Sequence, residues 1–228
     1  MDLEDIWPLF GLTITTPRLT LSPVRDADLP GLVRAALDGV HDPEQMPFGF
    51  PWTDAPASDL PGNLAIYQWG LRGRVSPSSW NIAFAAHYEG RVIGTQDLSA
   101  YDFANRQTVN SGSWITRSVQ GRGLGTEMRA GLLAFAFDVL GAEWAESSAT
   151  STNAASLAVS RKLGYELNGV TRQSPRPGQP VDEQRVRLPR ADFLRPNWSP
   201  QIVCSDAVLR QLGAAHGLIA ASTDTIAA

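Results

Sequence analysis

The segment Gln120 to Thr126, with the sequence QGRGLGT, restricts the fold of this chain more than any other part of it. A β-rich run precedes it and a long apolar helical pattern follows, so it joins a strand to a helix. Glycine tolerates positive φ angles and has no side chain to keep a ligand from the backbone. Free N–H groups at a helix start attract anions. The sequence therefore predicts a phosphate-binding loop, and the alternative is a flexible glycine-rich turn.

Two common nucleotide motifs fit this loop poorly. A Walker A motif needs a lysine before its Ser or Thr, and here Gly125 precedes Thr126. The dinucleotide fingerprint belongs to a repeated βαβ unit, whereas Gly121, Gly123 and Gly125 follow a predicted antiparallel meander. Glu143 lies about 20 residues beyond the loop, where an acidic residue would bind ribose. A Rossmann-type oxidoreductase therefore stays open as the weaker alternative.

Hydrophobic periodicity around the loop predicts a chain of mixed strands and helices. Three β-rich runs before the loop are joined by short polar turns, which predicts an antiparallel meander. The expected strands cover residues 16–24, 80–88, 91–100, 108–116 and 143–150, with two more on either side of the loop 174–180. The expected helices cover residues 29–37, 60–71, 124–140 and 153–163.

Composition excludes several classes of partner. With 43% apolar and 18% charged residues the chain should fold into an ordinary globular protein. Its net charge of −4 argues against nucleic acid as a partner, because backbone phosphates bind clustered Lys and Arg. The apolar run AGLLAFAF at 130–137 is too short to cross a membrane.

The single cysteine, Cys204, cannot form an internal disulfide, which is typical of a reducing compartment. The acidic opening MDLEDIWPLF does not have the pattern of a secretory signal. We therefore expect a soluble cytoplasmic protein without a metal site.

Two segments resemble the GNAT acyltransferase superfamily. SWITRSVQGRGLGTEMRAGLLAFAFD is similar to the central motif, with Gln120, Gly123 and Gly125 in its Q/RxxGxG/A loop. TSTNAASLAVSRKLGYE is similar to the second motif, an Asn-initiated helix that ends in a KLGY-type turn. The start TPRLTLSPVRDADL resembles the RimJ/RimL-like branch. The resemblance covers about residues 13–190.

This resemblance implies an α/β (α+β) GNAT fold, with a mixed, mostly antiparallel sheet of about seven strands flanked by helices. Its central parallel pair, residues 111–116 and 143–149, should splay apart around the thioester arm of coenzyme A. We expect an acyltransferase domain over residues 1–190 and a C-terminal extension over 191–228. A helix near Asp206 to Leu212 and a frayed end beyond Ser222 are expected in that extension.

The resemblance also implies which residues bind the acyl donor. Backbone groups of the strand before the loop should pair with the pantetheine arm, as an added strand would. Asn153 should contact the arm and also act as the N-cap of its helix. The expected donor-binding residues are Trp114, Ile115, Thr116, Gln120, Gly121, Arg122, Gly123, Leu124, Gly125, Thr126 and Asn153.

The leaving thiolate needs a proton. Many relatives use a tyrosine four residues before the glycine of the KLGY turn, where this chain has Ser160. The RimL-like branch has a serine three residues after the Asn, which makes Ser156 the expected acid. An ordinary solvent-facing serine is the alternative. The general base is open among His41, His87, Glu44 and Asp97.

The resemblance implies direct transfer of an acyl group from coenzyme A to an amine in a ternary complex. Acetyl-coenzyme A is the expected donor, and succinyl-coenzyme A stays open because Arg172 and Arg176 could meet a carboxylate. The acceptor is a small-molecule amine or a protein N-terminus. A homo-oligomer is left open, and so is a catalytically silent module that only binds coenzyme A.

Overall fold

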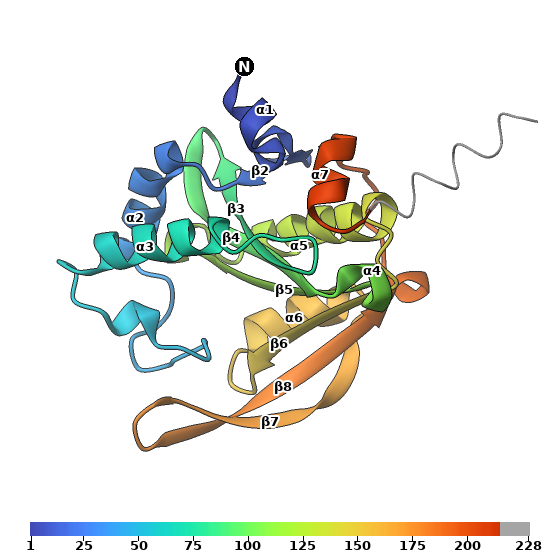
Figure 1. Cartoon of the computed structure of the whole chain (residues 1–228). Helices are drawn as coiled ribbons and strands as arrows, with labels where there is room; N and C mark the ends of the chain where they lie inside the picture. Colours follow the sequence, from blue (N-terminus) through green and yellow to red (C-terminus); the bar gives the residue numbers. More distant parts are fainter. Residues whose placement is uncertain (215–228) are drawn as a thin grey trace, which may run out of the picture.

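The computed structural model describes residues 1–214, which build one sheet with helices on both faces (Figure 1). The strand order is β7-β8-β6-β5-β4-β3-β2-β1-β9. All neighbours are antiparallel except β5 and β6. This is the expected mixed sheet with a parallel central pair. The predicted frayed end beyond Ser222 lies outside the described residues.

The strands are β1 (Thr13–Thr15), β2 (Leu19–Pro23), β3 (Ser79–Tyr88), β4 (Arg91–Tyr101), β5 (Thr108–Ile115), β6 (Trp144–Thr150), β7 (Glu166–Arg176), β8 (Gln179–Pro189) and β9 (Gln201–Val203). The α-helices are α1 (Leu3–Ile6), α2 (Leu29–Leu37), α3 (Leu60–Arg72), α4 (Phe103–Arg106), α5 (Leu124–Ala134), α6 (Ala154–Lys162) and α7 (Asp206–Gln211). A π-helical segment, Phe135–Val139, extends α5, and short 3-10 turns include Pro8–Gly11, Trp52–Asp54 and Arg190–Asp192.

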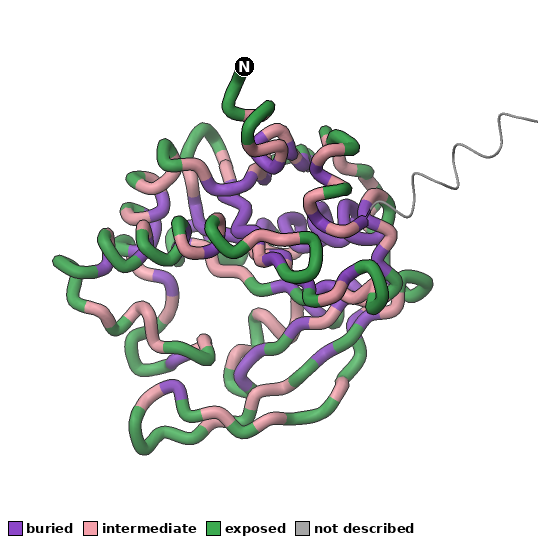
Figure 2. The backbone as a smooth tube through the Cα atoms, in the orientation of Figure 1, coloured by how far each residue is buried: buried purple, intermediate pink, exposed green. Residues whose placement is uncertain are grey.

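Successive side chains of β3 point to opposite faces of the sheet. Phe84 packs edge-on against Phe135 at the end of α5, with ring centroids 6.4 Å apart. Ala83 and Ala85 instead join a cluster with Leu32 and with other residues of the α2 and α3 side. Buried residues concentrate in the inner strands and α5, as Figure 2 shows. The sheet therefore lies between an α5 layer and an α2–α3 layer.

The described part of the sheet has nine strands rather than about seven. The strand predicted over 16–24 is β2, and β1 is a further short strand just before it, where the chain folds back and the Thr16 N–H donates to the Leu19 carbonyl. β9 is only three residues long, which is too short for a period-two pattern to be recognised.

The segment after residue 200 packs on the rest of the chain. β9 pairs with β1 along the sheet edge. Val208 and Leu212 of the α7 region are fully buried, and Trp80 Nε1 donates to the Leu212 carbonyl at 3.0 Å. The division of the chain at residue 190 stays a prediction. Within residues 1–214, no helix combines the length and apolar character that crossing a bilayer requires.

Candidate active site

The parallel strands β5 and β6 separate half-way along their length. Their pairing ends at Ser111 and Ser147, where Ser147 Oγ donates to the Ser111 carbonyl at 2.7 Å. Beyond this point β5 stays paired with β4 as far as Ile115, and β6 stays paired with β8 as far as Thr150. Each strand follows its outer neighbour, so a gap opens between them.

The backbone of β5 presents free polar groups to this gap. The Thr116 N–H donates to the Ile93 carbonyl on β4. Because backbone groups alternate sides along a strand, those of Ser113 and Ile115 face away from β4, toward the gap. Consistently, the Ile115 carbonyl accepts a hydrogen bond from Gln120 Nε2 at 2.8 Å. Of the three predicted strand residues, Ile115 thus has its backbone toward the gap.

The other two predicted strand residues are occupied by contacts within the protein. The Trp114 backbone faces β4, as that of Thr116 does, because the two are separated by one residue. The Trp114 ring packs on Trp52, with ring centroids 5.3 Å apart. Thr116 is buried, and its hydroxyl donates to the Gly39 carbonyl at 3.3 Å. Neither offers a backbone group to a ligand in the gap.

The glycine loop leads directly into α5. Gly121 and Gly123 have φ angles of +75° and +79°, which disfavour residues with a side chain. Gly125 lies within α5, and a Cβ there would meet only open space. The Leu124 side chain is buried in the core, so Leu124 can offer a ligand only its backbone N–H. The backbone N–H of Thr126 is available beside it. Their N–H groups have no partner within the helix, which makes this end an anion cradle.

Two side chains hold the loop in place. Gln120 Nε2 donates to the Val40 carbonyl at 2.7 Å as well as to that of Ile115. Arg122 is exposed, and its Nη2 donates to the Ser118 carbonyl at 3.3 Å. Gln120 therefore ties the loop to the α2–α3 connection, whereas Arg122 bonds only within its own turn.

Sequence reasoning missed Arg18, which reaches the loop from the β1–β2 connection. Its Nη1 donates to the Arg122 carbonyl at 3.0 Å, and a Cβ on Gly123 would lie 3.6 Å from its Nη2. Arg18 Nε also pairs with Glu127 Oε2 at 2.6 Å. Glu127 is buried and accepts from Thr16 Oγ1 at 2.7 Å. The sequence carries no local signal for this contact, because the partners are far apart along the chain.

Asn153 is the N-cap of α6, as predicted. Its Oδ1 accepts from the Ser156 N–H at 3.1 Å, which satisfies one free donor of the helix start. Ser156 is half-buried. Contact of Asn153 with the cofactor arm stays a prediction, and so does the role of Ser156 as acid.

A family model described as "Acetyltransferase (GNAT) domain" matches residues 18–166 of this chain. The chain belongs to the GNAT acetyltransferase family. It is therefore grouped with coenzyme A-dependent N-acetyltransferases.

Solved GNAT structures have the same fold. RimJ of Mycobacterium smegmatis, in complex with CoA-disulfide, is 20% identical, with a TM-score of 0.69 over 95% of this chain and 96% of that one. RimL, an alpha-N-protein acetyltransferase of ribosomal L7/L12, is 18% identical, with a TM-score of 0.58 over 77% of this chain and 96% of that one. A chimera of spermidine N-acetyltransferase SpeG from Vibrio cholerae and hSSAT is 14% identical, with a TM-score of 0.60 over 78% of this chain and 99% of that one.

The GNAT tyrosine position is held by a serine that is already engaged. Ser160 is buried, accepts from Arg129 Nη1 at 2.9 Å and donates to the Ser156 carbonyl at 3.2 Å. Burial lowers the pKa of Arg129, while the nearby Tyr165 acts in the opposite direction. The Ser160 hydroxyl is therefore held inside the protein rather than presented to a substrate.

Two of the predicted base candidates have structural roles. His41 Nδ1 lies 2.8 Å from the Asp42 carbonyl oxygen, and its Nε2 lies 2.6 Å from Thr53 Oγ1. His87 Nε2 lies 3.4 Å from Asp28 Oδ1, on a strand two positions away from β5. Neither imidazole is free beside the gap.

The β7–β8 hairpin reaches the α2–α3 connection. Arg176 makes a bidentate pair with Asp54, and its Nη2 also donates to the Pro43 carbonyl at 3.0 Å. The Arg176 hydrogen bonds hold the pKa of Asp54 below its ordinary value. Arg172 pairs with Asp182. Both arginines have carboxylate partners within the protein. They therefore no longer support the expectation that a succinyl carboxylate binds to them.

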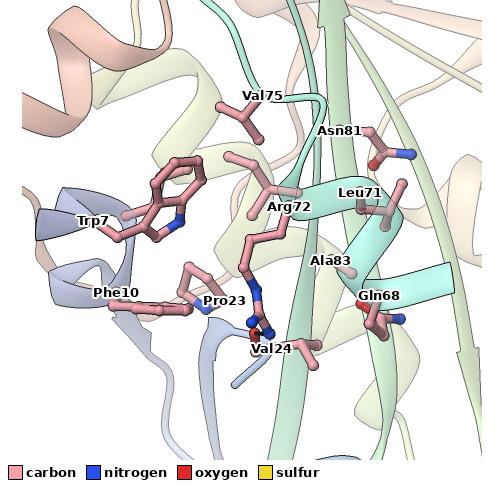
Figure 3. A pocket seen from close by; sticks show the side chains of 12 residues that line it. Trp7, Phe10, Pro23, Val24, Gln68, Leu71, Arg72, Val75, Asn81 and Ala83 are labelled. Carbon is pink, nitrogen blue, oxygen red and sulfur yellow. Dashed lines mark hydrogen bonds between the residues drawn. The ribbon is translucent and has the colours of Figure 1, made fainter. Parts of the chain in front are cut away.

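Two hollows lie on the α2–α3 side of the sheet. A polar cavity of about 250 Å³ is lined by Asn110, Glu146, Ser147, Ser148, Asn168, Thr171, Gln173, Glu183, Arg185 and Val186. A second hollow of about 30 Å³, under Gln68 and Leu71 of α3, has room for only one or two waters (Figure 3). The larger cavity can hold part of a substrate. In residues 1–214, no three His, Cys, Asp or Glu side chains gather as metal ligands would.

Proposed function

We propose that this protein transfers an acetyl group from acetyl-coenzyme A to an amine by direct attack in a ternary complex. The observation that carries this proposal is the gap that opens beyond Ser111 and Ser147, next to the glycine loop. An extended ligand arm fits a gap edged by free backbone groups, and its pyrophosphate fits a helix N-terminus.

The donor's pyrophosphate would lie against the N–H groups of Gly123 to Thr126. Open space where the side chains of Gly121 and Gly125 would be supports this fit. Arg18 adds a positive charge beside the loop, with 43% of its side chain exposed. Arg18, whose Nη2 lies beside Gly123, and the exposed Arg122 are both candidates for a phosphate contact.

The thioester would lie along β5. The Ile115 N–H faces the gap and can donate to the thioester carbonyl oxygen as negative charge develops there. A positioned donor of this kind contributes about 3 kcal/mol to stabilising a transition state. The Ser113 N–H, two residues earlier on β5, faces the same way and is the second donor available on this edge.

Ser156 would supply the proton that the departing thiolate takes up. In the reaction, the amine nitrogen forms a bond to the thioester carbon and the C–S bond breaks. The nitrogen loses a proton as the amide forms, and coenzyme A leaves as the thiol. Ser156 has the hydroxyl for this role, since that of Ser160 is bonded to Arg129 and to the Ser156 carbonyl.

Calorimetry with acetyl-coenzyme A, succinyl-coenzyme A, NAD and ATP tests the donor. We expect tight binding of acetyl-coenzyme A and weaker binding of the succinyl ester. Preference for NAD would contradict the proposal and support the Rossmann alternative. A turnover assay with peptide and small amines then separates an enzyme from a silent module, which would bind the donor without transfer.

A further inference from the structure

We propose that Arg129 of α5 is a fixed positive charge that stabilises the coenzyme A thiolate when the C–S bond breaks. This inference rests on the proposed function and adds a charged residue to the same site. The Arg129 side chain is buried, so it acts through its electric field rather than by contact with a substrate.

Arg129 is an interior arginine without a carboxylate partner. The residue is only 3% exposed, and none of the ion pairs within residues 1–214 includes it. Its Nη1 donates to Ser160 Oγ at 2.9 Å, whereas its Nε is fully shielded and has no hydrogen-bond partner in that part of the chain. Burial lowers the pKa of Arg129, but a guanidinium stays charged in a protein. The fold therefore holds a positive charge that nothing beside it balances.

The groups around Arg129 do not neutralise this charge. Tyr165, directly before β7, is buried, and burial raises the pKa of its phenol, so the phenol stays neutral. From α6, Arg129 is met by the uncharged hydroxyl of Ser160. Glu127, two residues earlier on α5, is already paired with Arg18.

Such a charge is costly to keep in a protein interior. Removing a cation from water without a partner destabilises the fold, and an apolar side chain of similar size often fills the same space at a lower cost. If packing alone decided this position, methionine or leucine would serve better than Arg129. Strongly perturbed charged groups are typical of functional sites. We therefore infer that the charge serves an anion that forms during the reaction.

Arg129 lies near the closed end of the gap between β5 and β6. The Tyr165 phenol is close enough to both Arg129 and Ser111 for each of them to lower its pKa. Ser111 and Ser147 are the last pair before the two strands separate. The hydroxyl oxygens of Ser111 and Tyr165 are also shielded, and neither has a hydrogen-bond partner within residues 1–214. The guanidinium, the phenol and the Ser111 hydroxyl thus gather where the gap begins.

The proposed orientation of the donor brings its sulfur toward this end. The glycine loop, which would hold the pyrophosphate, follows β5 at the open end of the gap. A pantetheine arm that pairs with β5 therefore runs from the loop toward Ser111, and the sulfur is at its deep end. The proposed acid is close to the same charge, because Ser160 Oγ accepts from Arg129 and donates to the Ser156 carbonyl at 3.2 Å.

A positive charge in this place lowers the free energy of a thiolate. Opposite charges attract more strongly in a protein interior than in water, and salt screens buried charges poorly. When the C–S bond breaks, its electron pair passes to sulfur, which then takes up the Ser156 proton. The proton that the amine nitrogen loses replaces the one from Ser156, and Arg129 keeps its own protons throughout. The same charge should lower the thiol pKa of bound coenzyme A.

An NMR titration of coenzyme A bound to the protein tests this expectation. A ¹³C label on the carbon next to sulfur reports whether the thiol is ionised. We expect wild type to lower the thiol pKa by about 1 relative to free coenzyme A, and Arg129→Met to lose this effect. Arg129→Lys keeps a charge and should retain part of it. Arg129→Gln, which can still donate a hydrogen bond but is uncharged, gives the same comparison if the methionine variant does not fold.

Arg161→Met is the matched control, because Arg161 is also near Ser160 in sequence but is exposed, where solvent screens its charge. It should leave the thiol pKa unchanged. In single-turnover experiments Arg129→Met should transfer the acetyl group about tenfold more slowly, as a pKa difference of about 1 implies. Its affinity for acetyl-coenzyme A, whose sulfur is uncharged, should stay the same by calorimetry. Urea unfolding should show Arg129→Met to be at least as stable as wild type, whereas a purely structural arginine would be missed.

A thiol pKa in the wild-type complex equal to that of free coenzyme A overturns the inference without any variant. A lowered pKa that persists in Arg129→Met overturns it as well, since another group then stabilises the thiolate. Both results leave the proposed function intact as long as wild type binds acetyl-coenzyme A and acetylates an amine. If wild type binds no acetyl-coenzyme A by calorimetry, the proposed function fails, and the inference with it.

Discussion

Arg18 Nε and Glu127 Oε2 meet at 2.6 Å although the two residues are 109 positions apart in the chain. The same carboxylate accepts from the Arg18 N–H at 2.8 Å and from Thr16 Oγ1 at 2.7 Å. Glu127 therefore connects the β1–β2 turn to the first turn of α5. Through this connection Arg18 is held beside the glycine loop.

Replacing Glu127 with glutamine should weaken both stability and donor binding. Hydrogen bonds to a buried charged group contribute about 1.5–3 kcal/mol each, so we expect a loss of at least about 2 kcal/mol in urea unfolding. Acetyl-coenzyme A affinity should fall about tenfold, because Arg18 is no longer fixed beside the loop. Glu143→Gln, at an exposed position, is the control. A variant as stable as wild type would show that the contact does not hold the turn to α5.

Gly123→Val should abolish binding of acetyl-coenzyme A while unfolding stays cooperative. A β-branched residue disfavours a φ of +79° and would occupy the approach to the helix N-terminus. Gly141→Val is a matched control, since Gly141 also has a φ of +79° and open space around it, at the far end of the helix. Equal affinity of the two variants by calorimetry would contradict the assignment of the cradle.

Ser156→Ala should lower turnover about 10²-fold with little change in donor affinity. Ser160→Ala should instead leave turnover nearly unchanged and cost about 1–2 kcal/mol of stability, because it removes the acceptor of buried Arg129. Single-turnover kinetics and urea unfolding separate the two effects. The opposite ranking in turnover would make Ser160 the acid.

Asp97→Asn should stabilise the fold increasingly as pH rises. The folded-state pKa of Asp97, about 7, lies above its ordinary value of 3.8, so folding favours the protonated acid. The stability from this preference is complete below about pH 4 and is lost as pH rises through about 7. Raising this pKa by about three corresponds to at most about 4 kcal/mol of unfolding free energy. Partial exposure reduces this contribution to roughly 1–2 kcal/mol. Melting temperatures of the variant and wild type at pH 5 and pH 8 check this. A difference in melting temperature that does not grow with pH would contradict it.

Local patterns predicted the parts of the site that depend on neighbours in sequence. The glycine loop, the α5 start and the Asn153 cap each follow from a few adjacent residues. The family resemblance predicted the splayed strands. Neither source could predict that Arg18 reaches Glu127, or that Asp97 lies opposite Gly112, since sheet register and long-range pairing decide those contacts. The ion pairs of Arg172 and Arg176 could not be predicted for the same reason, because their partners lie on other segments.

The pairing of β1 with β9 has a consequence for how the protein is made. A ribosome releases residues 13–15 long before residues 201–203, so the outer edge of β1 has no partner during almost the whole of synthesis. An open strand edge can pair with another nascent chain. β9 thus covers the outer edge of β1 only at the end of synthesis, and its own three residues leave a much shorter open edge in its place.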